Sequence, residues 1–204
     1  MIPNRILAFG ASTCEGKGDP VGGGFVGRLK TWREIADYQQ NYVYNLGISG
    51  NTSSDVLKRF FGEAKPRHPD LIIFQFGGND IRREGSARSE IKISLSDYVK
   101  NLTELILQAK QLSQVLFISS IPIDDSKTQP IGWVPYYYAQ ADVATYAAKL
   151  QQICAEQQVP YLDIFNDWLK LDYSKYLHAD GLHPSVLGHQ VIFDQLKAKL
   201  LELY

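Results

Sequence analysis

The stretch Asp70-Leu71-Ile72-Ile73-Phe74-Gln75-Phe76-Gly77-Gly78 decides the fold class of this chain. It is apolar at almost every position between Asp70 and Gly77, which is typical of a parallel strand whose two faces are both covered by helices. The glycine pair then ends the strand. Similar short apolar runs flank this stretch in the sequence, at residues 5–9, 42–46, 115–119 and 159–163.

Longer amphipathic segments separate the apolar runs. Apolar residues recur at helical spacing over a segment that Thr52 or Ser53 can cap, and over residues 25–38, 95–112, 141–157 and 185–203. This alternation predicts one α/β domain over residues 1–204, in which helices cover both faces of a five-stranded parallel sheet. Residues 80–93 are predicted to be a loop, and residues 122–138 an irregular segment rich in proline and aromatic residues.

Charge and composition narrow the classes of function. The 204 residues can bury a sizeable core, and the net charge of -1 gives no electrostatic basis for binding nucleic acid or an anionic membrane surface. No window reaches the ~18 uninterrupted apolar residues of a membrane span, and the first residues do not resemble a signal peptide. The isolated Cys14 and Cys154 form neither a disulfide framework nor a zinc pattern. We therefore expect a cytoplasmic protein that uses no cofactor or metal; the sequence does not specify its oligomeric state.

The segment Gly10-Ala11-Ser12-Thr13 follows the first predicted strand. A serine in a glycine-opened turn at the carboxyl end of a parallel strand presents its hydroxyl at the edge where such sheets bind ligands. Ser12 is therefore a candidate nucleophile, although a helix cap is the alternative for this residue taken alone. The Gly16-Lys17 pair in the same loop does not make a P-loop, because its spacing from Gly10 is one residue too long and Gly18 follows it.

The segment Asp180-Gly181-Leu182-His183-Pro184 precedes the last predicted helix. An aspartate three residues before a histidine can accept a hydrogen bond from the imidazole Nδ1–H, which leaves Nε2 free to take a proton from a serine. Asp180 and His183 are therefore candidates for the orienting acid and the base. The alternative is that Asp180 caps the helix and His183 lies on the surface.

Two glycine-rich loops follow the second and third predicted strands. In Gly77-Gly78-Asn79-Asp80, the Asn79 amide can donate to a developing oxyanion, whereas Asp80 can tie down neighbouring loops. In Gly47-Ile48-Ser49-Gly50-Asn51-Thr52, a glycine can bring a bare backbone N–H close to a ligand. Each signal is weak by itself, but together they supply a nucleophile, a base, an orienting acid and oxyanion donors, which is the set that acyl transfer requires.

At these residues the sequence resembles the SGNH hydrolases, also called the GDSL esterase and lipase family. The four blocks occur in order, at residues 9–12, 47–52, 77–80 and 180–184. The resemblance implies a flavodoxin-like three-layer fold and metal-independent hydrolysis of a carboxylic ester through an acyl-enzyme. It assigns the triad to Ser12, Asp180 and His183, and the oxyanion donors to the Ser12 and Gly50 N–H groups and the Asn79 side chain. One position departs from the family pattern: Ala11 stands where an aspartate usually precedes the serine.

Three other interpretations are weighed against the esterase. An α/β-hydrolase carries its Gly-x-Ser-x-Gly elbow in mid-chain, whereas Ser12 follows the first strand and position 14 is cysteine. A flavodoxin-like module that binds FMN or a phosphorylated ligand has no use for Asp180 and His183. An inactive SGNH-fold interaction protein is suggested only by Ala11.

The sequence says least about the substrate, beyond a small-molecule acyl ester. The segment 133–138 follows the fourth predicted strand, and Trp133 and Tyr137 are candidates for a pocket wall, with a packed surface loop as the alternative. Cys14 is expected to be buried packing rather than a nucleophile. Asp163 is expected to be structural. The three other histidines, His68, His178 and His189, are expected to have no triad-like partner, and His178 to lie at the surface.

Overall fold

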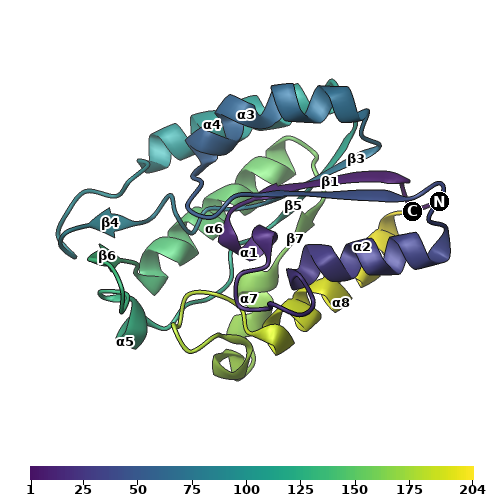
Figure 1. Cartoon of the computed structure of the whole chain (residues 1–204). Helices are drawn as coiled ribbons and strands as arrows, with labels where there is room; N and C mark the ends of the chain where they lie inside the picture. Colours follow the sequence, from purple (N-terminus) through teal and green to yellow (C-terminus); the bar gives the residue numbers. More distant parts are fainter.

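The central sheet of the computed structural model, which describes residues 1–204, has five parallel strands in the order β2-β1-β3-β5-β7 (Figure 1). The strands are β1 (Arg5–Gly10), β2 (Tyr42–Gly47), β3 (Leu71–Gln75), β5 (Gln114–Ile118) and β7 (Tyr161–Leu162). Strand order reverses between β1 and β3, because the chain passes from β2 back across β1 to β3. The sheet is the predicted flavodoxin-like arrangement, and ligands bind such sheets at the carboxyl ends of the strands beside this reversal.

Helices cover both faces of the sheet, as the apolar strands predict (Figure 1). One face packs against α3 (Ser53–Ala64), α4 (Leu95–Lys110) and α6 (Gln140–Glu156), and the other against α2 (Gly24–Ala36), α7 (Ile164–Leu169) and α8 (Val186–Leu203). Alternate residues of a strand serve the two faces: Leu7 and Phe9 pack in one apolar cluster, whereas Ile6 and Ala8 pack in the other. None of the helices combines the length and apolar character that spanning a bilayer requires.

Side-chain caps fix where several helices begin. Thr52 forms a reciprocal capping box with Asp55 at the start of α3, and Ser185 accepts a hydrogen bond from the Gly188 N–H at the start of α8. Asp163, which directly follows β7, caps α7 through the Asn166 N–H. Asp163 is thus structural, as expected.

The regions predicted as loop contain structure that the sequence pattern does not reveal. Within residues 80–93, β4 (Arg83–Glu84) pairs antiparallel with β6 (Tyr136–Tyr137), which lies within the segment predicted to be irregular. The same segment contains α5 (Asp125–Thr128). The short α1 (Ser12–Glu15), η1 (Lys65–Arg67), α7 and η2 (Tyr173–Tyr176) were also not predicted. All are six residues or shorter, too short to show a hydrophobic period.

Candidate active site

The candidate residues converge on the carboxyl edge of the sheet. Ser12 begins α1 directly after β1, Gly50 lies in the loop after β2, and Asn79 lies in the turn after β3. His183 comes from the other end of the chain, in a tight loop closed by an antiparallel bridge between Leu177 and Pro184. The loop is further held by a 2.8 Å hydrogen bond from the His178 N–H to the His183 carbonyl.

Ser12, His183 and Asp180 form a continuous hydrogen-bonded chain. The Ser12 Oγ lies 3.0 Å from His183 Nε2, and His183 Nδ1 lies 2.9 Å from Asp180 Oδ2. A carboxylate only accepts, so Nδ1 must carry the proton and Nε2 must accept from the serine hydroxyl. This is the tautomer in which the imidazole can remove the serine proton.

Asp180 is built to remain ionised. Burial acts to raise its pKa, but hydrogen bonds from His183 Nδ1 and from the backbone N–H groups of His183 and Leu182 outweigh burial and hold the pKa well below its usual range. The structure corrects one expectation here. His178 does have a carboxylate partner, because its Nδ1 lies 3.1 Å from the same Asp180 Oδ2 while about half of its side chain stays exposed.

Two groups beside Ser12 are free to donate to a ligand. The Asn79 Nδ2 donates to the Asn51 carbonyl at 3.1 Å, which orients the amide and leaves its second N–H available. Gly50 has a φ of 84°, a left-handed conformation that favours glycine, and its N–H makes no hydrogen bond within the protein. Gly47, by contrast, packs against the backbone of Cys14 and Glu15, where a Cβ would clash. Of the two glycines, only Gly50 has a free N–H, because the Gly47 N–H donates to the Asn45 side chain at 3.0 Å.

Asp80 links the two donor loops. Its buried carboxylate accepts from the backbone N–H of Ser53 at 2.9 Å and from the Ser53 hydroxyl, at the start of α3 just beyond Gly50. Burial raises the pKa of Asp80 to about 7 despite these hydrogen bonds. The carboxylate thus ties the Asn79 turn to the loop that carries Gly50, in agreement with the anchoring role expected from sequence.

Arg59 is a second anchor, and sequence reasoning missed it. From the middle of α3 its guanidinium donates to the Leu46 carbonyl at 2.6 Å, the Gly10 carbonyl at 3.3 Å and the Asn51 side chain at 2.8 Å. It therefore fastens the ends of β1 and β2 to the loop beside Gly50. No local signal marks this role, because an arginine on an amphipathic helix is ordinarily a solvated surface residue.

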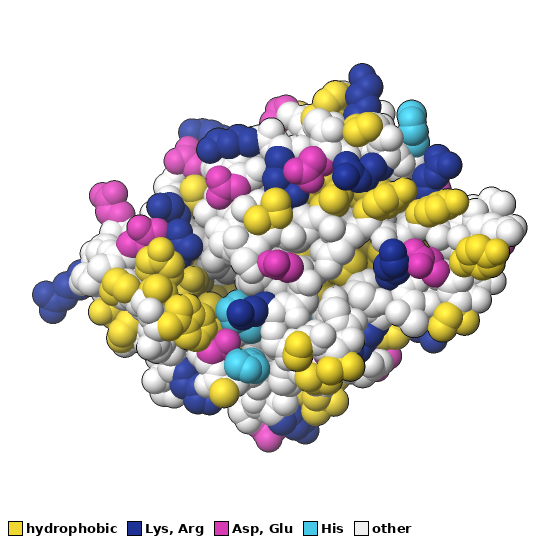
Figure 2. All heavy atoms as spheres, viewed as in Figure 1, with side chains coloured by type: hydrophobic (Ala, Val, Ile, Leu, Met, Phe, Trp, Pro, Cys, Tyr) yellow, Lys and Arg dark blue, Asp and Glu magenta, His cyan; other side chains and the backbone are white.

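Two adjoining cavities open at Ser12. A cavity of about 50 Å³ is lined mainly by apolar side chains together with Ser12, Asn79 and His183. A wider cavity of about 250 Å³ shares those three residues and extends past Gly50 to Trp133, Tyr136 and Tyr138. We call these three aromatic residues the aromatic wall, and Ser12, Gly50, Asn79 and His183 the catalytic edge. Figure 2 shows apolar side chains gathered over the end of the molecule that carries β4 and β6, beside the histidine side chains.

The aromatic wall only partly matches the residues proposed from sequence. Trp133 lines the wider cavity and stacks over His183, with ring centroids 6.5 Å apart. Tyr137 lines neither cavity, because side chains alternate along β6 and its neighbours Tyr136 and Tyr138 face the cavity instead.

The other residues considered from sequence lie outside the hydrogen-bonded chain of Ser12, His183 and Asp180. Cys14 is fully buried, and burial raises the pKa of its thiol to about 12, so it is packing as expected. Ala11 is also buried, directly before Ser12. No three side chains of His, Cys, Asp or Glu gather so as to hold a metal ion.

Comparison with known proteins agrees with this geometry. Residues 8–191 match the model of the GDSL-like lipase/acylhydrolase family. The chain belongs to this family. Membership makes it a hydrolase that acts on ester bonds. It is 28% identical to an acetylxylan esterase from Geobacillus stearothermophilus, over 92% of this chain and 90% of that protein. It is 33% identical to the uncharacterized protein YpmR of Bacillus subtilis, over 92% of this chain and 77% of that protein.

Further relatives of this GDSL-like hydrolase differ in length. The GDSL esterase/lipase CPRD49 of Arabidopsis thaliana is 26% identical, but the match spans 74% of this chain and only 61% of that protein. Among solved structures, a lipase/acylhydrolase from Enterococcus faecalis superposes with a TM-score of 0.74 at 24% identity, over 97% of this chain and 95% of that one. This likeness shows that the two proteins share a fold.

Proposed function

We propose that this chain hydrolyses short-chain carboxylic esters by way of an acyl-enzyme on Ser12. The observation that carries the proposal is the 3.0 Å contact between Ser12 Oγ and His183 Nε2, with Asp180 bound to the opposite ring nitrogen at 2.9 Å. A hydroxyl, an imidazole and a carboxylate in this order form the arrangement that activates a serine for acyl transfer.

The cycle has two halves. In the first, His183 takes the hydroxyl proton as Ser12 Oγ attacks the acyl carbonyl, and the oxyanion accepts from the Ser12 N–H, the Gly50 N–H and the Asn79 amide. The intermediate collapses to the acyl-enzyme, and His183 gives its proton to the departing alcohol. In the second half, a water attacks the acyl-enzyme in the same way and releases the acid. These residues supply every role in the cycle, so it uses no metal ion.

The size of the smaller cavity supports a short acyl group. The cavity of about 50 Å³ is small, and its lining is mainly apolar, including Ile123 and Val143. We assign it to the acyl chain and the wider, open cavity to the alcohol. The relative from Geobacillus stearothermophilus, named as an acetylxylan esterase, is consistent with an acetyl group as the acyl part.

A panel of p-nitrophenyl esters from acetate to laurate, run on the wild type and on Ser12→Ala, tests the proposal. We expect kcat/KM to fall beyond butyrate and Ser12→Ala to lose about a thousandfold or more in kcat. A fluorophosphonate should label the wild type once per chain, and mass spectrometry should place the label on Ser12. Full activity in Ser12→Ala would refute the nucleophile, whereas a bound flavin without labelling would favour the flavodoxin-like alternative.

We also propose a cytoplasmic location. Both cysteines are buried free thiols, which suits a reducing compartment. Cell fractionation of the source organism tests this assignment.

A further inference from the structure

The wider cavity carries positive charge that the proposed chemistry does not use. Lys17 and Arg82 both line it, and none of its lining residues is a carboxylate. Neither cation touches the hydrogen-bonded chain of Ser12, His183 and Asp180. A cavity with two cations and no acid is complementary to an anion.

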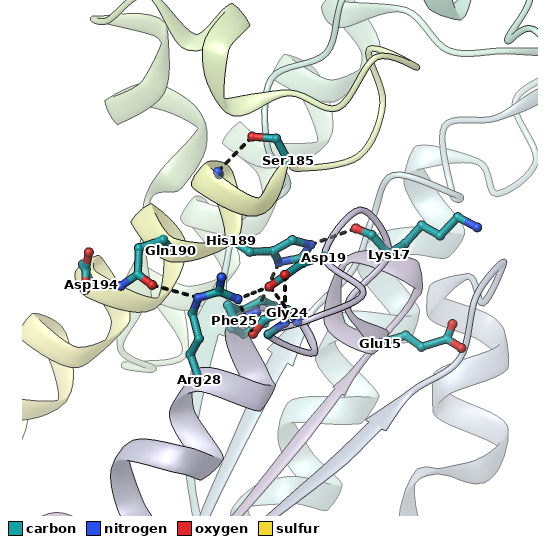
Figure 3. Close-up of polar contacts among 12 residues, drawn as sticks. Glu15, Lys17, Asp19, Gly24, Phe25, Arg28, Ser185, His189, Gln190 and Asp194 are labelled. Carbon is teal, nitrogen blue, oxygen red and sulfur yellow. Dashed lines mark hydrogen bonds and ion pairs between the residues drawn. The ribbon is translucent and has the colours of Figure 1, made fainter.

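Lys17 is held at the rim of this cavity by a buried polar cluster (Figure 3). Its backbone carbonyl accepts a 2.8 Å hydrogen bond from His189 Nε2, and His189 Nδ1 accepts from the Phe25 N–H at 3.2 Å. Asp19, which is buried in the same loop, pairs with Arg28 on α2. The Lys17 side chain points away from this cluster in Figure 3, and its ammonium has no ion-pair partner. The fold thus fixes the backbone of Lys17 and leaves its ammonium without an ion-pair partner.

Arg82 reaches the cavity from the loop after β3. Its guanidinium lies over the Tyr136 ring, 4.4 Å from the centroid, which holds it against the aromatic wall. It donates to Glu84 at 2.8 Å, and its Nε is buried without a partner. Lys92 pairs with the same carboxylate at 3.1 Å, so one acid serves two cations. The Arg82 side of the cavity keeps a net positive charge.

The nearby carboxylates are already engaged. Asp180 accepts from His183 and from two backbone N–H groups, and Glu15 accepts from the Ser49 N–H and hydroxyl. These neutral donors leave both carboxylates charged, but neither carboxylate forms an ion pair with Lys17 or Arg82. Because no carboxylate lines the wider cavity, an anion on a bound molecule can pair directly with both cations there.

We propose that the wider cavity selects esters whose alcohol part carries an anionic group, a carboxylate or a phosphate, which Lys17 and Arg82 bind. This inference rests on the proposed function, because it assigns the alcohol to the wider cavity and the acyl group to the smaller one. Trp133 offers an apolar face to the body of the alcohol, and the two cations fix its charged end. On hydrolysis the alcohol leaves with its anionic group unchanged.

Matched acetyl esters test the selection. 3-Acetoxybenzoate and 3-acetoxyphenyl phosphate carry the anion, and 3-acetoxybenzamide is the neutral control of similar shape. In the wild type we expect kcat/KM for at least one anionic ester to exceed that for the neutral ester about tenfold, chiefly through KM. The advantage should shrink with added salt, because the cavity is open to solvent. Whichever anion is preferred identifies the chemical source of the group.

Charge variants give the decisive comparison. Lys17→Met should lower the anionic-to-neutral ratio about fivefold, Lys17→Glu should lower it further, and Lys17→Met combined with Arg82→Met should bring it near one. The control is Lys149→Met on α6, which removes the same charge from a residue that lines none of the cavities described here. A wild-type ratio of one or less, or a ratio that Lys17→Glu leaves unchanged, would overturn the proposal.

Equilibrium binding separates this inference from the proposed function. Calorimetry on Ser12→Ala with the product alcohols 3-hydroxybenzoate, 3-hydroxyphenyl phosphate and 3-hydroxybenzamide needs no turnover. Tighter binding of an anionic alcohol, lost in Ser12→Ala/Lys17→Glu, supports the anion site even if none of the esters is hydrolysed. Equal binding of all three alcohols refutes the site even if the neutral ester is hydrolysed in a Ser12-dependent manner.

Discussion

The catalytic edge and the aromatic wall face the same cavities but are built in different ways. Ser12, Gly50 and Asn79 each lie within a few residues of the end of a strand of the central sheet, and His183 is 7% exposed. Trp133 is 58% exposed and belongs to a segment held by two-residue strands. The groups proposed for the chemistry therefore lie at the carboxyl edge of the central sheet, and Trp133 lies on a surface ribbon.

The largest effect is expected from Asn79→Ala on the catalytic edge. We expect kcat to fall about a hundredfold, because one preorganised donor to the oxyanion is lost. The free energy of unfolding should fall by only about 1 kcal/mol, the value of the hydrogen bond to the Asn51 carbonyl. Steady-state kinetics and urea unfolding measure the two effects. Asn166→Ala, at the start of α7, is the control, and near wild-type turnover in Asn79→Ala would remove Asn79 from the site.

A second test is Asp80→Asn, which replaces the buried carboxyl group behind the catalytic edge by an amide. We expect kcat to fall about tenfold, since the anchor between the Asn79 turn and the α3 start is weakened without loss of a group that touches substrate. A matched change at the surface, Asp172→Asn, should leave kcat unaltered. A drop as large as that of Asn79→Ala would instead give Asp80 a direct part in the reaction.

The same variant should change how stability depends on pH. Burial raises the pKa of Asp80 to about 7 in the folded protein, above the 3.8 of an exposed carboxyl. Between these values the folded state holds a proton that the unfolded state has lost, so wild-type stability falls as pH rises from about 4 to 7. The amide that replaces this carboxyl cannot titrate, so the difference in Tm between wild type and Asp80→Asn should shrink from pH 5 to pH 8. A difference that grows with pH would show that the pKa of Asp80 is lowered.

The different construction of the catalytic edge and the aromatic wall also explains why the first could be predicted from sequence and the second only in part. Ser12, Asn79, Asp180 and His183 were predicted from local signals: a strand, a glycine turn, a three-residue spacing. The alternation of strands and helices predicted the wound sheet that brings Ser12 and His183 together. The β4–β6 pairing joins residues about 50 apart through two-residue strands, which leave no periodic pattern. Without that pairing, the choice between Tyr137 and its neighbours in the wall could not be made from sequence.

Arg59 and His178 show a second limit of prediction from sequence. Both act through contacts that only the folded chain creates: Arg59 with carbonyls at the ends of two strands, and His178 with the acid that His183 also uses. Backbone carbonyls carry no sequence signature. A histidine two residues from an aspartate gives no hint that the loop will turn both imidazoles toward one carboxylate.

A third, smaller effect is expected on the preference for acyl-chain length, which we assign to the smaller cavity. Val143→Ala removes two methyl groups from a residue that lines the smaller cavity, with Val143 only 3% exposed. The ratio of kcat/KM for butyrate to acetate esters should rise about fivefold, at the low end of what one or two methylenes are worth in an apolar pocket. Val186→Ala, at an exposed position at the start of α8, is the control. An unchanged ratio would place the acyl chain outside this cavity.

The smallest effect should come from the aromatic wall, and it distinguishes two neighbouring positions. Trp133→Ala should raise KM about threefold for aryl esters with little change in kcat, since a half-exposed ring contributes modest contact area and no reacting group. Tyr137→Ala should leave KM unchanged, because Tyr137 lines neither cavity. Initial rates on the same ester panel measure both variants. A KM increase for Tyr137→Ala equal to that for Trp133→Ala would mean that the ribbon turns its other face to the substrate, and unchanged KM in both would leave the wall without a part in binding.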